Sequence, residues 1–594
     1  MEIKKFYQNK LIVFFAIIVV VLIFYSNIFN NQFAYDDNDF FVNWQTVESL
    51  GNAKALVLGD LPLSHQHVYR PLRSLLQAVT YQLFGQNPLG YHFLGLFFYI
   101  LAIYLLYLIF RKIINAKVAF LSAMIFAVLP VHVEAVTFVT ASFDLFGIVL
   151  MLASLYFYLL GRNKNKAYLA LSLILSLAAL FSYELTVVLP LLLVLYDKCS
   201  DRGKKIIVSV KENWFYFLGV AVYLAARFYV MKLLNPQSFL TELDPKTIVF
   251  TSIKSFSNYV YLAVFNYPLS VNHQTVLSSS IFDFSVVFSI IIFALLLYLS
   301  WYFYKKNKSV YTLLIGWFII GLLPAANLVR VSRFVAERYL FLSSVAFGVL
   351  VPLIFFKLFN YFSNKKQTAA RIITVIVLVL VFLTYGFMSY VRNNDWQNDE
   401  TLWQKTLKNE TGDTRSLNNL AFELRQKGQN EKAIDYLGQA IKLDPNYYLA
   451  YENLGEIYSE LNQHDKAIEN FNKVIELKPN YFIAYANRGF DYFLLGEAEL
   501  AEKDYLKALE LNPQFYQANL NLGGFYFEAG NFEQAIGYFE KALAIDGSNS
   551  EVYEALGLAY LGASQPSAAK ASFAKALKIN PNSSRARDFL NKLK

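Results

Sequence analysis

The sequence predicts an all-helical protein in which a polytopic membrane part is followed by an array of helical repeats. Its 594 residues are 56% hydrophobic and only 16% charged, against about 25% charged residues in an average soluble domain. Long apolar runs fill residues 1–391, which carry a formal charge of +15, whereas residues 392–594 carry −6. The last third of the chain also repeats with a fixed period.

Charge and cysteine content exclude several classes of protein. Because the positive charge belongs to the apolar part, it indicates membrane topology and not a nucleic-acid-binding surface. A single cysteine, Cys199, excludes intramolecular disulfides, iron–sulfur clusters and cysteine-type zinc sites.

The first apolar run, 11–30, follows three lysines and has the length of a membrane-spanning helix. We interpret it as a span and not as a cleaved signal peptide, because no small-residue cleavage site follows it. Ten further spans are expected near 91–110, 118–131, 145–161, 167–182, 185–197, 213–231, 284–304, 310–325, 339–358 and 372–391. The sequence thus predicts about 11 spans.

Lysine and arginine in the connecting loops favour a cytoplasmic N-terminus. With that orientation, the cytoplasmic segments hold about two thirds of the 31 basic residues in 1–391. An odd number of spans then places everything after Val391 on the exoplasmic side. Segment 247–266, which has Lys254 in its middle, is expected to be interfacial or re-entrant.

Small residues and prolines recur every 34 positions in the last third, which predicts tetratricopeptide repeats, pairs of antiparallel helices that stack into a superhelix. We expect a membrane domain at 1–391, a connecting segment at 392–411 and repeats at 412–594. The last range comprises four repeats to about 547, a fifth at 548–581 and a capping helix. The recurring residues are Gly455, Gly489, Gly523 and Gly557; Ala433, Ala467, Ala501, Ala535 and Ala569; and Pro445, Pro479, Pro513 and Pro581.

Repeat arrays of this kind present a concave surface that binds extended peptides or partner helices. Asn453, Asn487 and Asn521 recur at equivalent positions and are candidate groove residues. The same array would serve equally as a scaffold for an oligomer.

A cluster of acidic residues directly follows the first span. The phrase "FAYDDNDFFVN" contains Asp36, Asp37 and Asp39 among aromatic residues. A solvated turn is one interpretation of this pattern. A general base is the other, since partial desolvation raises the basicity of a carboxylate toward neutral pH.

Basic residues lie at the predicted exoplasmic ends of the spans. Arginine there either extends to lipid headgroups or holds a lipid phosphate with its planar fork. The phrases "VYRPLRSLL" and "RVSRFVAERYLFLSS" contain them, and a histidine begins the second span. These residues are Arg70, Arg73, His92, Arg330, Arg333 and Arg338, with Glu337 among them.

Further ionisable residues interrupt apolar sequence, where they are costly unless they have a function or a partner. His132, Glu134 and Asp144 lie in "LPVHVEAVTFVTASFDLFG", and Glu184 lies in "FSYELTVVLP". His132 and Glu134 make a weak metal site, so a hydrogen-bonded structural role is favoured and no metal is expected. All these clusters fall on the predicted exoplasmic side, which indicates an active site there.

The sequence lacks the P-loop, dinucleotide-binding, H-E-x-x-H and G-x-S-x-G motifs. This excludes nucleotide-driven chemistry, zinc proteolysis and the common serine hydrolase arrangement. A sugar carried on a lipid phosphate would supply an activated group outside the cytoplasm.

These motifs, in this order, resemble the transmembrane O-mannosyltransferases with tetratricopeptide repeats. That family belongs to the GT-C class of polyprenyl-phosphate-sugar glycosyltransferases, and this chain resembles a bacterial relative. The resemblance extends along nearly the whole chain. The matching phrases are "FAYDDNDFFVN", "YRPL", "NPLGYH", "PVHVEAV", "ASFDLFG", "SYELTVVLP", "VAERYLFLSS" and "RNNDWQNDETLW", with Asp197 beyond the sixth.

The resemblance implies an inverting transfer of a sugar from a polyprenyl phosphate to a protein Ser/Thr hydroxyl bound by the repeats. It implies Asp36 or Asp37 as the base. Lipid-phosphate contacts would come from Arg70, Arg73, His92, Arg333 and Arg338, and sugar or acceptor orientation from His132, Glu134, Asp144, Glu184 and Glu337. The enzyme would lie in the bacterial inner membrane, with its repeats in the periplasm.

The chain departs from the family pattern at three positions. Leu129, Ser142 and Tyr183 stand where the family often has His, Arg and Lys, so the sugar and the carrier do not follow from the resemblance. Alternatives remain: transfer to a glycan or lipid, a non-catalytic membrane-anchored scaffold, and a lipid flippase.

Overall fold

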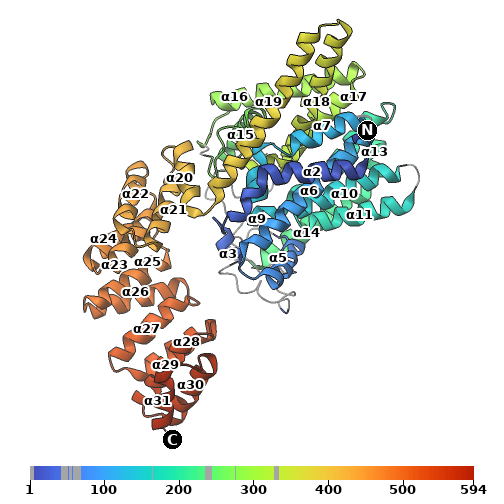
Figure 1. Cartoon of the computed structure of the whole chain (residues 1–594). Helices are drawn as coiled ribbons and strands as arrows, with labels where there is room; N and C mark the ends of the chain where they lie inside the picture. The colour runs from blue at the N-terminus through green and yellow to red at the C-terminus, as the bar shows by residue number, and fades with distance from the viewer. Residues whose placement is uncertain are drawn as a thin grey trace. The chain divides into compact units, whose positions relative to one another are not determined.

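The structure is a computed structural model that describes residues 6–41, 51, 56–57, 69–162, 165–234, 244–273, 276–326 and 334–593. The chain divides into two compact units, residues 1–411 and 412–594. The described residues of both units form helices and no strands, as predicted (Figure 1). The connecting segment 392–411 lies in the first unit.

The first unit contains 18 described α-helices. The long ones carry the apolar runs, and short ones gather where the charged clusters were predicted. In order they are α2 (Lys10–Tyr25), α3 (Asp37–Phe41), α5 (Pro71–Phe84), α6 (Pro88–Ile113), α7 (Ala116–Phe126), α8 (Val133–Thr137), α9 (Val139–Ser142), α10 (Asp144–Gly161), α11 (Lys166–Leu180), α12 (Leu189–Ser200), α13 (Ile206–Glu212), α14 (Trp214–Leu234), α15 (Pro245–Phe265), α16 (Phe284–Lys305), α17 (Ser309–Leu322), α18 (Leu340–Asn364), α19 (Thr368–Asn393) and α20 (Asp399–Asn409).

Short 3₁₀ helices cap or link several of these helices, and three of them carry residues of the predicted site. They are η1 (Ser26–Asn30), η5 (Pro130–His132), η6 (Glu184–Val188), η8 (Leu323–Ala326), η9 (Glu337–Tyr339) and η10 (Asn394–Trp396).

Among the described residues, eight helices are long and apolar enough to cross a membrane, or up to nine if a bent pair counts as one span. The bent pair, Ala116–Phe126 and Pro130–Thr137, turns by 63° and matches the predicted span 118–131. A multi-pass membrane protein is therefore confirmed as the architecture of this unit.

The predicted number of spans needs correction at three places. The apolar helix at 167–182 is shorter than a span, and 185–197 is split between η6 and the 12-residue α12, whereas α14 covers the predicted span 213–231 with 21 residues. Conversely α15, which covers the segment expected to be interfacial, is long and apolar enough to span. An odd or even number of spans therefore no longer places the repeats on one side of the membrane.

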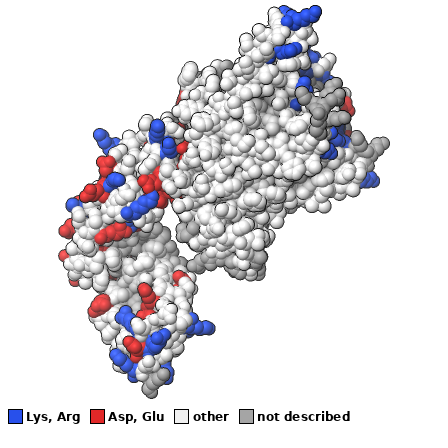
Figure 2. All heavy atoms as spheres, in the orientation of Figure 1, with Lys and Arg blue, Asp and Glu red and all other residues white. Residues whose placement is uncertain are grey.

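The spans differ in how much of their surface other helices cover. α6, α10 and α18 are mostly buried, whereas α16 and α19 present most of their apolar side chains outward. Figure 2 shows a broad face of the first unit almost without charged side chains. Such a surface fits a lipid environment, because apolar side chains gain nothing by contact with water.

The second unit consists of α21 (Thr414–Gln426) to α31 (Ser584–Lys592), and successive helices pack in antiparallel pairs. The recurring glycines allow the two helices of a repeat to approach closely. A Cβ atom at Gly455, Gly523 or Gly557 would lie 2.7 Å from a phenylalanine ring of the second helix. The intervening helices are α22 (Asn430–Leu443), α23 (Tyr448–Glu460), α24 (His464–Leu477), α25 (Phe482–Leu494), α26 (Ala498–Leu511), α27 (Tyr516–Glu528), α28 (Phe532–Ile545), α29 (Ser550–Gly562) and α30 (Pro566–Ile579).

Candidate functional site

Asp37 is buried, and both of its carboxylate oxygens accept hydrogen bonds. Oδ1 accepts from the backbone N–H and the hydroxyl of Thr140, at 2.6 and 2.7 Å. Oδ2 accepts from the backbone N–H groups of Val139 and Ala34, each at 3.3 Å. Asp37 thereby caps the start of α9, whose first N–H groups have no partner within the helix. Burial raises the pKa of Asp37 to about 7, against the opposing effect of the hydrogen bonds from Thr140.

Asp36 precedes this buried carboxylate in the chain and is only partly buried. Its other neighbour, Tyr35, has φ of 60°, in the left-handed region that residues with a Cβ rarely adopt. The Tyr35 N–H donates to Asp399 Oδ1 at 2.6 Å, and its ring packs against Trp403 and Phe138. The connecting segment therefore fixes the turn that carries Asp36.

Four charged side chains form a network of ion pairs, which we name the Arg70 network. Its members are Arg70, Arg73, Asp144 and Glu184. Arg70 donates to both oxygens of Glu184, at 2.5 and 2.6 Å, and to Asp144 at 2.9 Å. Arg73 lies 3.0 Å from the same Asp144 oxygen and donates to the carbonyl of Thr140 at 2.8 Å. Since Thr140 also binds Asp37, the network connects to the acidic cluster.

Helix ends bring these charges together. Arg70 immediately precedes Pro71, the first residue of α5, while Asp144 begins α10 and Glu184 begins η6. A carboxylate in the first turn of a helix is stabilised by the positive end of the helix dipole. The sequence therefore folds so that the starts of α5, α10 and η6 bring Arg70, Asp144 and Glu184 together.

A second group of ion pairs forms around η9. Arg338 binds Glu134 through its guanidinium and through its backbone N–H, the latter at 3.0 Å. Glu337 is fully buried and accepts from the Ser270 N–H at 2.5 Å and from Arg392 at 3.2 Å. The structure thus brings Glu134, from the predicted cluster with His132 and Asp144, into direct contact with Arg338 of the last predicted basic cluster.

His273 joins this second group, lying 3.5 Å from Glu337 and 3.6 Å from Glu410. Burial lowers the pKa of His273, but hydrogen bonding and attraction from the two carboxylates outweigh burial and raise it to about 9. Sequence reasoning missed His273, Arg392 and Thr140 as site residues. Thr140 and Arg392 lie within the quoted phrases, but no pattern links them to partners far away in the chain, and His273 lies outside every quoted phrase.

The two predicted histidines lie in the protein interior. The ring nitrogens of His132 are 3.0 Å from the Tyr99 hydroxyl and 2.7 Å from the Ser344 hydroxyl. Nε2 of His92 is 3.2 Å from the carbonyl oxygen of Asn31. Both contacts are of the kind that holds helices together. Arg330 and Arg333 lie outside the described residues.

An apolar groove runs beside Glu184, between η6, α12, α14 and η8, with a volume of about 230 Å³. Its walls are mainly leucine and valine, and Arg227 and Tyr223 contribute polar groups. The lining residues are Glu184, Leu185, Val187, Val188, Leu191, Val220, Tyr223, Leu224, Arg227, Leu323 and Pro324. Within the described chain, no group of three His, Cys, Asp or Glu side chains is placed to hold a metal ion.

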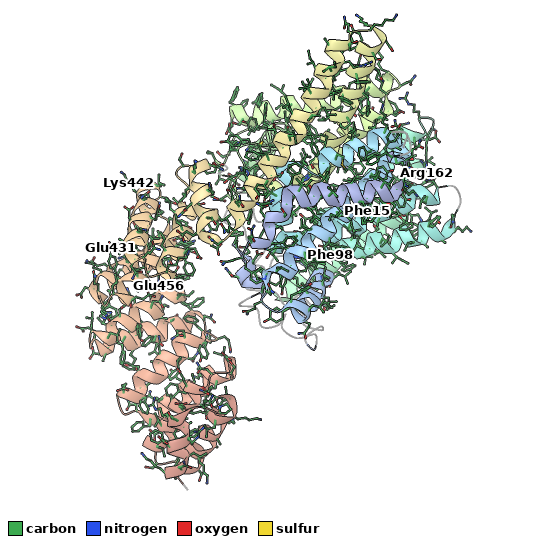
Figure 3. All side chains as sticks on the ribbon, in the orientation of Figure 1. Phe15, Phe98, Arg162, Glu431, Lys442 and Glu456 are labelled. Carbon is green, nitrogen blue, oxygen red and sulfur yellow. The ribbon has the colours of Figure 1, made fainter. Side chains whose placement is uncertain are left out.

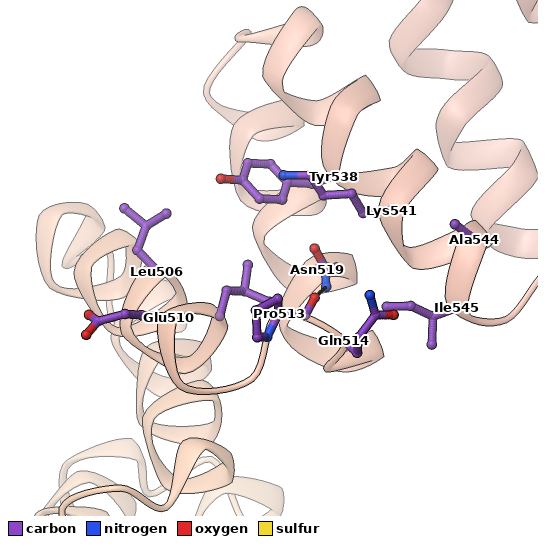
Figure 4. Close-up of a pocket in the computed structure, with 10 residues that line it drawn as sticks. Leu506, Glu510, Pro513, Gln514, Asn519, Tyr538, Lys541, Ala544 and Ile545 are labelled. Atoms are coloured by element: carbon purple, nitrogen blue, oxygen red, sulfur yellow. Dashed lines mark hydrogen bonds between the residues drawn. The ribbon is translucent and has the colours of Figure 1, made fainter. Parts of the chain in front are cut away.

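The second unit has its own hollow, of about 450 Å³, between α26, α27 and α28 (Figure 4). Most of its lining comes from the second helices of two consecutive repeats. Asn453, Asn487 and Asn521 lie instead on first helices, and Asn453 donates to Asn418 at 2.8 Å. The lining residues are Leu506, Leu509, Glu510, Pro513, Gln514, Asn519, Tyr538, Lys541, Ala544 and Ile545.

Comparison with known families agrees with this architecture. A family model described as dolichyl-phosphate-mannose-protein mannosyltransferase matches residues 67–230, which include Arg70, Arg73, Asp144 and Glu184. Four tetratricopeptide repeat models match within the second unit, at 423–462, 448–481, 491–550 and 526–593.

Individual proteins are similar over most of the chain. Protein O-mannosyl-transferase F38B6.6 of Caenorhabditis elegans is 26% identical, over 73% of this chain and 62% of that protein. Protein O-mannosyl-transferase TMTC3 is 25% identical in mouse and in human, over 75% of this chain and 52% and 53% of those proteins. The chain spans about half to three fifths of these relatives. The resemblance to transmembrane O-mannosyltransferases with tetratricopeptide repeats is confirmed.

Proposed function

We propose that this protein is a membrane glycosyltransferase that moves a sugar from a polyprenyl phosphate to a protein hydroxyl. The observation that carries the proposal is the match of the mannosyltransferase model to the segment that contains the Arg70 network. This network connects through Thr140 to the acidic cluster of the first loop. A base and several cations therefore converge from segments far apart in the chain.

The proposed base is Asp36. Asp37 accepts four hydrogen bonds, three from the start of α9 and one from Ala34, so we assign it a positioning role. Asp36 is held between this anchor and the constrained Tyr35, and remains partly exposed. It would take the proton of an acceptor hydroxyl as the oxygen attacks the anomeric carbon. The bond from that carbon to the phosphate oxygen breaks on the opposite side, which inverts the configuration.

The departing polyprenyl phosphate is a stable anion and needs no strong acid, but it needs cations. Arg70 and Arg338 are the candidates, since each guanidinium has five N–H donors and retains donors beyond those used by its carboxylates. The apolar groove beside Glu184 has the leucine and valine walls that a polyprenyl chain would contact.

We propose that the reaction takes place on the exoplasmic side of the cytoplasmic membrane. The last turns of α6, α12 and α16 carry basic residues. These helix ends lie at the edge of the first unit remote from the acidic cluster, which we name the basic edge, and basic residues are expected at cytoplasmic ends. The chain leaves the last span beside the cluster, where Arg392 binds Glu337 and Asn393 binds Thr137. The repeats would therefore follow on the same side as Asp36 and present acceptor protein there.

The test uses purified protein, a panel of radiolabelled polyprenyl-phosphate sugars and a cell-envelope acceptor fraction. We expect label in a protease-sensitive product, and loss of that label with Asp36→Asn. Asp201→Asn, which also removes one carboxylate, is the matched control because Asp201 lies beyond α12 at the basic edge. Label in a lipid or glycan would contradict the protein acceptor, and no transfer by folded protein from any donor would contradict the enzyme.

A further inference from the structure

A hollow at the basic edge of the first unit is separate from the proposed active site. It has a volume of about 430 Å³ and is lined by Lys112, Leu159, Arg162 and Tyr196. Asp144 begins α10 and Arg162 follows its end, so the hollow lies about 27 Å along the helix from the Arg70 network. Figure 3 labels Arg162 at that end of the helices.

The hollow lies at the level where two spans end. Lys112 is in the last turn of the span Pro88–Ile113, and Arg162 directly follows the span Val139–Gly161. Tyr196 comes from α12, and the Arg162 guanidinium lies 5.3 Å from the centre of its ring. Three helices therefore place two cations and one aromatic ring around a space at the membrane edge. Lipid headgroups occupy this level of a bilayer.

Intramolecular contacts hold both cations in position without using all their donors. In the described chain, Lys112 donates to the Leu159 carbonyl at 3.2 Å, which leaves two ammonium protons. Arg162 donates to the Ser200 hydroxyl at 2.6 Å and lies 3.1 Å from Asp197, which leaves further guanidinium protons. Both side chains are therefore oriented before any ligand arrives.

The nearby carboxylates do not neutralise this group of cations. Asp197 is fully buried and is shared by Arg162 and Lys204, at 3.1 and 3.0 Å. Glu212 binds Lys204 at 2.5 Å. Asp197 and Glu212 thus pair with Arg162 and Lys204, and within the described chain no carboxylate pairs with Lys112. A site with this charge favours an anion.

We propose that this hollow binds the phosphate of an anionic phospholipid headgroup. Lys112 and Arg162 would donate to the phosphate oxygens. A charged phosphate with an attached chain satisfies both the cations and the position at the end of two spans. This site does not depend on the proposed function, since none of its residues takes part in the transfer reaction.

The test measures lipid binding to the intact purified protein by native mass spectrometry. Dioctanoyl phosphatidylglycerol is titrated against dioctanoyl phosphatidylcholine, and inorganic phosphate is added in a separate series. We expect tighter binding of phosphatidylglycerol, and Lys112→Gln to weaken it about three- to tenfold. Lys117→Gln is the matched control, because Lys117 lies at the same edge but contacts the Phe356 ring. Its affinity is expected to stay within about twofold of the original protein.

A second, conservative variant distinguishes the loss of lipid contacts from misfolding. Arg162→Lys keeps the charge but removes the planar fork, so it should weaken phosphatidylglycerol binding without abolishing it. Equal binding of the two lipids, or equal effects of Lys112→Gln and Lys117→Gln, would overturn the proposal. Inorganic phosphate that binds as tightly as phosphatidylglycerol, with the same loss in Lys112→Gln, would assign the hollow to a soluble phosphate and overturn the lipid.

Discussion

The membrane unit and the repeat unit use charged residues in different ways. In the membrane unit, Arg70, Asp144 and Glu184 are largely buried and bind one another across long sequence separations. In the repeat unit, pairs such as Lys473–Glu476 and Lys507–Glu510 lie on exposed helix faces three residues apart. Buried charges are stable only with their partners, whereas exposed ones are screened by water. Charged side chains are therefore part of the interior of the first unit, whereas those of the second unit lie mainly on its solvated surface (Figure 2).

The largest effect on stability should come from breaking the buried network. Arg70→Ala leaves Glu184 and Asp144 without their main partner, and we expect a loss of about 3–5 kcal/mol. Lys507→Ala, which breaks an exposed pair, should cost no more than about 0.5 kcal/mol. Thermal unfolding of both full-length variants in the same detergent measures the difference. Equal shifts in melting temperature would show that buried and exposed ion pairs contribute equally to the stability of the two units.

The second effect depends on pH and involves His273. Its folded pKa of about 9 exceeds the usual value of about 6.5, so the fold favours the protonated form. The stabilisation is fully present below about pH 6.5 and is lost as the pH rises through about 9. We expect His273→Gln to cost up to about 3 kcal/mol at pH 6 and progressively less toward pH 10. A cost independent of pH would exclude the charged pairing with Glu337 and Glu410.

The third effect tests close packing in the repeats. Gly523→Ala would place a Cβ atom 2.7 Å from the Phe539 ring, and overpacking of this kind costs about 1–3 kcal/mol. Hydrogen exchange of α27 and α28 in the intact protein should report faster opening of these helices. Unchanged protection would mean that the ring moves aside freely.

The smallest expected effect is an increase in stability. Gly537 lies inside α28 with no neighbouring atom within 4 Å of an added Cβ. Gly537→Ala should stabilise this helix by about 0.5–1 kcal/mol, because alanine loses less backbone entropy in a helix. Slower hydrogen exchange in α28 is the expected measurement. Faster exchange would reveal a contact at this surface.

The sequence predicted the repeat unit better than the membrane unit for a physical reason. A 34-residue period places the recurring glycines at equivalent positions, so Gly455, Gly523 and Gly557 each face a phenylalanine ring, and Gly489 faces the ring of Tyr505. The number of spans was harder to predict, because α12 is short and α15 carries the polar Lys254 within an apolar helix.

The partners within the candidate site were beyond the reach of sequence patterns. Arg70 and Glu184 are 114 positions apart, and Arg338 and Glu134 are 204 apart. Each residue is conspicuous in its own apolar stretch, but no periodicity links it to its partner. The different environments of Asp36 and Asp37 also follow from tertiary contacts, since the donors to Asp37 come mainly from the start of α9.

The central claim is that Asp36 performs proton transfer while Asp37 holds it in place. The most direct measurement compares Asp36→Asn and Asp37→Asn in sugar transfer from a polyprenyl phosphate, together with the thermal stability of each variant. We expect Asp36→Asn to keep its stability and to lose about 10²–10⁴-fold in rate. Asp37→Asn should lower stability, because its amide cannot accept the hydrogen bonds of both oxygens. An active Asp36→Asn enzyme, or a fully stable and inactive Asp37→Asn enzyme, would contradict this assignment.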